Sequence, residues 1–192
     1  IHRNSPIIIS GFVLTNEKLG LYSVFDKVIL AMISAFIVIY NSLYPRICNL
    51  YTQDNATQKV KEFFTKHLPA LALLVFLGML TFLLFGADLI ALLSEEIQSS
   101  EIGWEIALIA GIPVGLLINL PISLIIVSFN ILKIYLIYSS VAALSMVLIG
   151  SILGFYFGLK GVIIAIFITE IISALVGFLA LKKHFRTNQT KL

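Results

Sequence analysis

The stretch that decides the fold is GVIIAIFITEIISALVGFLAL, residues 161–181, which is followed at once by Lys182 and Lys183. Glu170 is its only ionisable residue, and the other positions are apolar or carry a small hydroxyl. Because an α-helix rises about 1.5 Å per residue, a helix of this length crosses the hydrocarbon core of a bilayer, which is about 30 Å thick. The stretch therefore predicts a membrane-spanning helix that ends in a basic, water-exposed segment.

Four further stretches share this character. Each supplies about 20 mostly apolar residues, as a spanning helix needs; they are residues 21–44, 68–87, 106–129 and 135–157. The chain is 59% hydrophobic and 12% charged, whereas soluble domains are roughly 25% charged, so the soluble class is excluded. The sequence thus predicts an all-α, polytopic transmembrane helix bundle with about five complete spans. Residues 1–15 hold an apolar run too short to span, which we interpret as a truncated N-terminal helix.

Basic residues collect in alternate connections between the predicted spans. Nine of them fall after residue 44, after residue 129 and in the tail of residues 182–192: Arg46, Lys59, Lys61, Lys66, Lys133, Lys182, Lys183, Arg186 and Lys191. The opposite connections hold only Lys18 and Lys160, and residues 94–105 are acidic. Because cytoplasmic loops carry the excess of Lys and Arg, we predict that the tail is cytoplasmic.

Residues 55–67, NATQKVKEFFTKH, have an amphipathic pattern. Val60, Phe63 and Phe64 recur at helical spacing, and charged residues occupy the positions between them. This pattern predicts an amphipathic cytoplasmic connector lying along the inner interface of the membrane. Binding of anionic lipid or of a cytoplasmic partner is the alternative interpretation, and a solvated connector is the one we favour.

The sequence offers no catalytic constellation. It has no nucleophile elbow, no His-rich metal motif and no Gly-rich phosphate loop, so we expect neither an enzyme, nor a cofactor, nor a metal site. The single Cys48 cannot close an internal disulfide. The basic residues form short clusters beside apolar spans, so nucleic acid is not an expected partner.

Glu170 is the best-placed candidate for function. Counted from residue 161, it lies roughly 14 Å deep, near the bilayer midplane, where an ionisable group costs at least about 2.5–3.5 kcal/mol. Ser173 and Gly177 follow on the same face, so we expect that face to meet protein or water. Two interpretations stay open. Glu170 is either an ion-coupling carboxyl that titrates or binds a cation during transport, or a protonated carboxyl that is hydrogen-bonded to a neighbouring helix.

A polar stripe runs along the first complete span. Lys27, Ser34 and Asn41 recur every seven residues, which predicts a helix that lines an aqueous cavity and makes these residues candidates for substrate binding. Lys27 either reaches an anionic ligand or extends to the outer interface. Asp26 points about 100° away and is a candidate to cap the helix, to pair across the bundle or to contact substrate. Arg3, in the truncated helix, is a further candidate to line the cavity.

The third and fourth spans carry residues that change how helices bend and pack. Pro113 and Pro121 predict a kinked or locally unwound third span, because proline removes a backbone donor. Gly150, Gly154 and Gly158 repeat every four residues, which predicts close approach of helices within the bundle.

The chain resembles a known family over essentially its whole length, and the resemblance is carried by short motifs. GLYSVFDKVILAMISAFIVIYNSLYPRICNLYTQD, residues 20–54, resembles the start of the second half of bacterial polysaccharide flippases, the O-antigen and teichuronic-type transporters of lipid-linked oligosaccharides. These belong to the multidrug, oligosaccharidyl-lipid and polysaccharide exporter superfamily. Phe85-Gly86 and YFGLKG at residues 156–161 are similar too. The matching positions in the first stretch are Gly20, Tyr22, Asp26, Lys27, Pro45 and Arg46.

The resemblance implies the carboxyl-terminal lobe of a fold like that of the multidrug and toxin extrusion proteins, in which two six-helix lobes surround a central cavity. It implies a bacterial inner (plasma) membrane protein that flips an undecaprenyl-pyrophosphate-linked sugar, together with an N-terminal lobe that supplies most of the positive charge. Lys27 matches the basic residue of the family in this helix, so the resemblance assigns it to the pyrophosphate.

Two other functions stay open at this point. One is a multidrug or cation antiporter of the same superfamily, in which Glu170 is the coupling carboxyl. The other is a membrane subunit of a polysaccharide-assembly enzyme that transports nothing itself. Inward-facing arginines in the missing lobe would favour the flippase, intramembrane carboxylates the antiporter, and a soluble catalytic domain the assembly enzyme.

Overall fold

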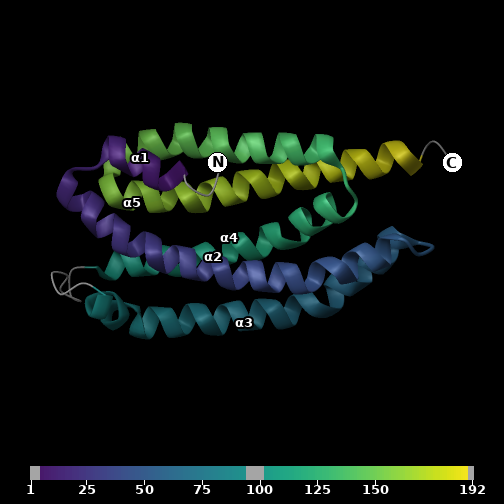
Figure 1. Cartoon of the computed structure of the whole chain (residues 1–192), viewed down its shortest axis with the longest axis horizontal. Coiled ribbons are helices and arrows are strands. Elements are labelled where there is room, and N and C mark those ends of the chain that lie inside the picture. The colour runs from purple at the N-terminus through teal and green to yellow at the C-terminus, as the bar shows by residue number, and fades with distance from the viewer. Residues whose placement is uncertain (1–4, 94–101, 190–192) are drawn as a thin grey trace.

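The computed structural model describes residues 5–93 and 102–189 as a bundle of helices (Figure 1). In chain order they are α1 (Ser5–Val13), α2 (Asn16–Tyr51), α3 (Ala56–Leu93), α4 (Gly103–Ser128) and α5 (Leu132–Gln189). The described residues contain no strand, so the predicted all-α helix bundle is confirmed. Helices α2 to α5 are each long and apolar enough to cross a membrane. By length and composition the chain is therefore a multi-pass membrane protein.

Helix α5 is folded into two arms at Gly158, where the backbone leaves helical geometry (φ 58°, ψ −135°). Figure 1 shows the first arm, residues 132–157, and the second arm, residues 159–189, side by side and running in opposite directions. Backbone angles in this region are strained for any residue with a Cβ, so glycine is required at the turn. The described part of the chain therefore contains five long helical segments beside the short α1.

Glycines bring the arms of α5 close to their neighbours. A Cβ added to Gly161 would lie 1.9 Å from the backbone oxygen of Leu153, and one added to Gly154 would lie 3.1 Å from a side chain of the other arm. A Cβ on Gly150 would lie 3.3 Å from a side chain of α1. The predicted close packing is thus confirmed for Gly150 and Gly154, whereas Gly158 forms the turn.

Helix α4 lies at the centre of the bundle and contacts α2, α3 and α5. It is helical from Gly103 to Ser128, with both Pro113 and Pro121 inside it, so the predicted local unwinding of this span is not found. Membrane helices tolerate proline where surrounding groups satisfy the freed backbone carbonyl. The break in helical geometry occurs instead at Gly158, where no proline is present.

Residues 55–67 were predicted to lie along the inner interface of the membrane, but their apolar face contacts other helices. It is helical, but it forms the first turns of α3 and is continuous with the long apolar part of that helix. Val60, Phe63 and Phe64 are buried in a cluster with Ile47 of α2 and with residues of α4. Since α2 and α4 offer an apolar surface at this end of the bundle, these three side chains pack against other helices.

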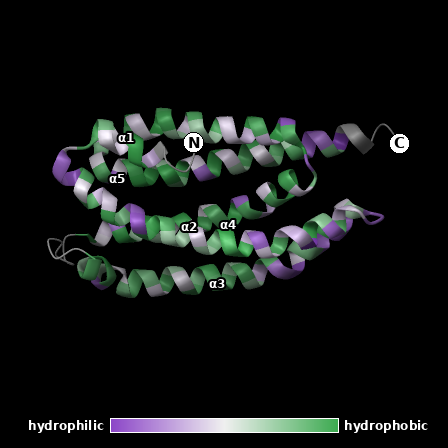
Figure 2. Ribbon diagram, in the orientation of Figure 1, coloured by the Kyte–Doolittle hydropathy of each residue, from purple (hydrophilic) through white to green (hydrophobic). Residues whose placement is uncertain are grey.

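The two ends of the bundle differ in charge. The connections between α2 and α3 and between α4 and α5 lie at the same end as the C-terminus (Figure 1), and Figure 2 shows hydrophilic residues gathered there. At the opposite end, near the Gly158 turn, Lys160 Nζ lies 3.6 Å from Glu105 Oε1. Residues predicted to share one side of the membrane therefore lie at one end of the bundle.

Candidate functional site

Polar side chains from three helical segments meet near the middle of the bundle. Asn119 of α4 donates hydrogen bonds from Nδ2 to the backbone oxygen of Glu170 (2.7 Å) and to its Oε2 (2.5 Å). Tyr138, from the first arm of α5, donates from its hydroxyl to Asn119 Oδ1 (3.0 Å). Ser173 accepts from Asn119 Nδ2 (3.2 Å) and donates to the backbone oxygen of Glu170 (2.9 Å). We call these four residues the polar cluster.

The polar cluster explains how a carboxyl is accommodated at this depth. Asn119 is 5% exposed and Ser173 is 1% exposed, and buried polar groups of this kind are costly unless they are hydrogen-bonded. One interpretation of Glu170 requires a hydrogen bond to a neighbouring helix, and the bond from Asn119 of α4 supplies it. Its role as an ion-coupling group stays a prediction.

Two glycines let the second arm of α5 approach its neighbours at the polar cluster. A Cβ on Gly115 of α4 would lie 2.9 Å from the Cβ of Glu170. A Cβ on Gly177 would lie 2.6 Å from Cγ2 of Ile122 and 3.0 Å from the ring of Tyr138. The expectation that the face bearing Glu170 and Gly177 meets protein is therefore confirmed.

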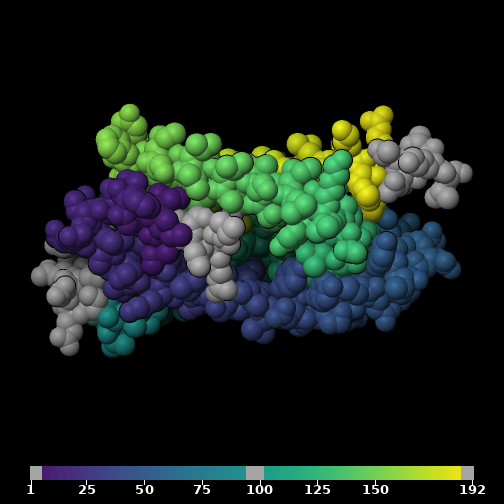
Figure 3. Space-filling model, turned by 45° about the horizontal axis from the view of Figure 1, so that its top comes forward, coloured from purple at the N-terminus to yellow at the C-terminus, as the bar shows by residue number. Residues whose placement is uncertain are grey.

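A cavity of about 320 Å³ opens beside the polar cluster, between α2, α4 and the first arm of α5. Figure 3 shows this hollow between the first arm of α5 and α2. Of the described residues that line it, one has a carboxyl and none is basic. Its polar lining is Tyr40, Asn119, Ser123, Tyr135, Tyr138, Ser139 and Glu170. The volume is at the lower end of the roughly 300–1,000 Å³ of ligand pockets, so a group of the size of one sugar ring fits it.

The stripe of Lys27, Ser34 and Asn41 lies outside this cavity. All three side chains are exposed, and Ser34 Oγ donates to the backbone oxygen of Leu30 in its own helix (2.7 Å). The wall that α2 contributes to the cavity is made instead by Ile33, Phe36, Ile37 and Tyr40. The predicted substrate-binding stripe and Glu170 therefore occupy neighbouring faces of the bundle, and the structure does not bring them together.

The structure tests a prediction for Asp26 but not the one for Arg3. Helix α2 begins at Asn16, so Asp26 lies well inside it, and the expectation that Asp26 caps the helix is wrong. Its half-buried carboxyl lies beside the hydroxyl of the fully buried Tyr22, one turn earlier on the same helix. Arg3 lies outside the described residues.

Sequence reasoning missed the partners of Glu170. Asn119 carries a recognisable signal, because it is a polar residue in the middle of an apolar span and lies one turn after Gly115 on the same face. Tyr138 carries a weaker one, since tyrosine near the end of a span is usual at the membrane interface. Neither signal tells which helix the residue contacts.

Comparison of this chain with family models, with curated proteins and with solved structures finds no match. Within residues 5–93 and 102–189, no group of three or more His, Cys, Asp or Glu side chains is placed to hold a metal ion. The geometry of the polar cluster and its cavity is therefore the basis for a proposal about function.

Replacing Gly115 by alanine is expected to lower the free energy of unfolding by about 1–2 kcal/mol, as small overpacking changes in cores do. The reason is that the new methyl group would overlap the Cβ of Glu170. Thermal unfolding of the purified protein in detergent measures the change. Gly111→Ala in the same helix is the matched control, because no atom lies within 4 Å of the added Cβ. Equal stability of the two variants would contradict the packing described for Glu170.

Proposed function

We propose that this chain is a membrane-embedded lobe of a transporter, in which the cavity between α2, α4 and α5 receives the polar part of the substrate. The observation that carries this proposal is the polar cluster, which opens to a cavity halfway along helices whose outer surfaces are apolar. Ionisable groups at this depth in membrane proteins typically mark the path of a substrate or an ion.

The finer proposal is that the substrate is an undecaprenyl-pyrophosphate-linked sugar and that the transporter is a polysaccharide flippase. Tyr40, Tyr135 and Tyr138 line the cavity and offer rings with a polar hydroxyl, the kind of surface that suits a sugar. Lys27 lies about 9 Å along the axis of α2 from Ile33, the nearest wall residue on that helix. A lysine ammonium there offsets the charge of a pyrophosphate while the sugar occupies the cavity.

The location and partners of the chain belong to the same proposal. The end that holds most of the basic residues lies at the cytoplasmic face of a bacterial inner membrane, which places the C-terminus inside the cell. An N-terminal lobe of the same protein closes the other side of the substrate path. The exposed stripe of Lys27, Ser34 and Asn41 then faces that lobe.

A cation antiporter is the second candidate, and one observation favours it. Glu170 supplies the only carboxyl among the described residues that line the cavity, and it has no ammonium or guanidinium partner among them. Such a carboxyl is suited to bind a proton or a cation during a transport cycle. Tyr138, Tyr40 and Tyr135 are the other titratable groups that face it across the cavity.

The test of the flippase proposal is translocation of lipid-linked oligosaccharide in membrane vesicles that contain the intact protein. Lys27→Ala is expected to lower the rate by about tenfold or more, since a hydrogen bond to a charged group contributes about 1.5–3 kcal/mol. Lys66→Ala, at an exposed lysine of α3, is the control and is expected to retain the rate. An undiminished rate for Lys27→Ala would remove Lys27 from substrate binding.

Glu170→Gln tests coupling separately from substrate binding. The amide keeps the shape of the side chain and a carbonyl oxygen for Asn119 but does not titrate. If Glu170 couples transport to protons, the rate of this variant is expected to be independent of pH where that of the wild type varies. Identical pH dependence of the two proteins would exclude Glu170 as the coupling group.

A further inference from the structure

A second, separate groove lies at the basic end of the bundle. It is formed by the start of α3, the end of α4 and the end of the second arm of α5, and it has a volume of about 570 Å³. Its walls are mostly aliphatic and aromatic, with Phe64, Ile125 and Leu181 representing the three helices. Lys61 and Lys182 line it as well, and none of the described lining residues is acidic. We call it the basic-end groove.

The basic-end groove continues toward the middle of the bundle. A wholly apolar cavity of about 450 Å³ adjoins it and shares Pro121, Ile122 and Phe178 with its walls. This second cavity extends along α5 to Ile171. From Lys182 to Ile171 a helix rises about 16 Å, and one leaflet of a bilayer contributes about 15 Å of hydrocarbon. The apolar path thus has the depth of one leaflet.

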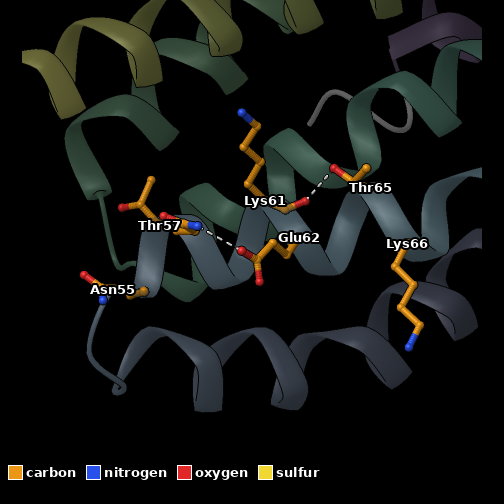
Figure 4. A pocket seen from close by; sticks show the side chains of 8 residues that line it. Asn55, Thr57, Lys61, Glu62, Thr65 and Lys66 are labelled. Atoms are coloured by element: carbon orange, nitrogen blue, oxygen red, sulfur yellow. Dashed lines mark hydrogen bonds between the residues drawn. The ribbon is translucent and has the colours of Figure 1, made fainter.

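The two lysines stand at the water-exposed opening of this path. Figure 4 shows Lys61 extending from α3 toward α4 and α5, whereas Lys66 points to the opposite side of α3. Both Lys61 and Lys182 are exposed, and neither forms an ion pair with a described carboxylate. Two unneutralised ammonium groups at the end of an apolar path attract an anion that is attached to a hydrocarbon chain.

We propose that the basic-end groove binds one anionic phospholipid, with the phosphate between Lys61 and Lys182 and an acyl chain along the apolar path. The charge of the opening selects an anionic over a zwitterionic headgroup. The apolar walls select a lipid over a free phosphate. Residues 55–67 then contribute to lipid binding through Lys61 at the opening and Phe64 in the wall of the groove. This site is on a different face from the transport cavity and does not depend on the proposed transport function.

The test is lipid binding to the intact protein purified in a mild detergent, measured by native mass spectrometry with phosphatidylglycerol and with phosphatidylcholine. Phosphatidylglycerol is expected to bind more tightly. Lys61→Gln or Lys182→Gln is expected to weaken its binding about fivefold, and the double variant about thirtyfold, from the usual contribution of a lysine near an anionic lipid. Binding of phosphatidylcholine should not change. Lys66→Gln is the matched control on the same helix and is expected to leave both affinities unchanged.

Phe178→Ala tests the apolar path independently of charge. This side chain borders both cavities and is 57% exposed, so the protein is expected to fold without it while phosphatidylglycerol binding weakens several-fold. Equal affinities for the two lipids, or a double lysine variant within twofold of the wild type, would overturn the proposal. Glycerol phosphate that competes as well as phosphatidylglycerol would also overturn it, because the acyl chain would then contribute nothing.

Discussion

Replacing Gly161 by alanine is expected to lower the free energy of unfolding by about 3 kcal/mol or more, which is at the upper end of single substitutions. A Cβ at this position would lie 1.9 Å from the backbone oxygen of Leu153. A backbone atom cannot rotate away as a flexible side chain can, so the two arms of α5 must separate. Because Glu170 and Tyr138 lie on opposite arms, this separation would also move Glu170 away from Tyr138. Thermal unfolding in detergent and the yield of monodisperse protein measure the effect.

Gly78→Ala is the control for this experiment. Gly78 lies in α3 with no atom within 4 Å of the added Cβ, so alanine should be neutral or, by its higher helix propensity, stabilising by up to about 1 kcal/mol. If Gly161→Ala melts at the same temperature as Gly78→Ala, the arms of α5 are not packed as described.

Replacing Asn119 by leucine is expected to destabilise the protein by about 3 kcal/mol. The change removes the donor to the Glu170 carboxyl and the acceptor of the Tyr138 hydroxyl. The Glu170 carboxyl and the Tyr138 hydroxyl are both half-buried, and a polar group that loses its partner costs up to about 1–3 kcal/mol. The measurement is again the unfolding temperature in detergent, converted to a free energy with chemical unfolding. Ser123→Ala is the control, because this hydroxyl donates only within its own helix, to Leu120.

A double substitution separates the hydrogen bond from loss of packing. Glu170→Leu combined with Asn119→Leu removes both partners, and replacing both by apolar groups is close to neutral. The double variant is therefore expected to be more stable than Asn119→Leu alone. Additive losses in the double variant would show that the two side chains are not coupled and would contradict the polar cluster.

The sequence was sufficient for the fold class because its signal is strong and local. An apolar stretch such as residues 161–181 identifies a spanning helix by length alone. The role of Gly158 was harder to read, since the same four-residue spacing predicts close packing at Gly150, Gly154 and Gly158 alike. Only the backbone angles distinguish the glycine that forms the turn from those that face another helix.

The sequence predicted the depth of Glu170 in the membrane but not the residues that Glu170 contacts. The depth of Glu170 follows from counting along one helix, but its partner Asn119 is 51 residues away and its neighbour Tyr138 lies on the opposite arm. Periodicity gives the face on which a residue lies and not the element that the face meets. For the same reason the sequence showed that Lys27 belongs to a regular polar stripe on α2 but not which face of α2 lines the cavity. The cavity wall is formed by the adjacent face of that helix.

The lipid-linked sugar named in the proposal comes from the resemblance to polysaccharide flippases. Its proposed binding site comes from the cavity beside the polar cluster. In the flippase proposal Lys27 is the contact for the pyrophosphate, and in either proposal Glu170 is the candidate coupling group, so the two variants test separate roles. Loss of translocation in Lys27→Ala together with a normal pH dependence in Glu170→Gln would retain the flippase and discard coupling through this carboxyl. The opposite outcome would favour the antiporter.

The proposed function requires that the cavity beside the polar cluster is open to water and substrate within the membrane. The most direct measurement is thiol labelling of Ser139→Cys in membranes, in a Cys48→Ala background, with a charged water-soluble reagent. Ser139 lines the cavity, while Leu144 on the same arm of α5 is 62% exposed on the apolar surface. Ser139→Cys is expected to be labelled and Leu144→Cys is expected not to be, because a thiol reacts as a hydrated thiolate. Labelling of Leu144→Cys with no labelling of Ser139→Cys from either side would contradict the proposed function.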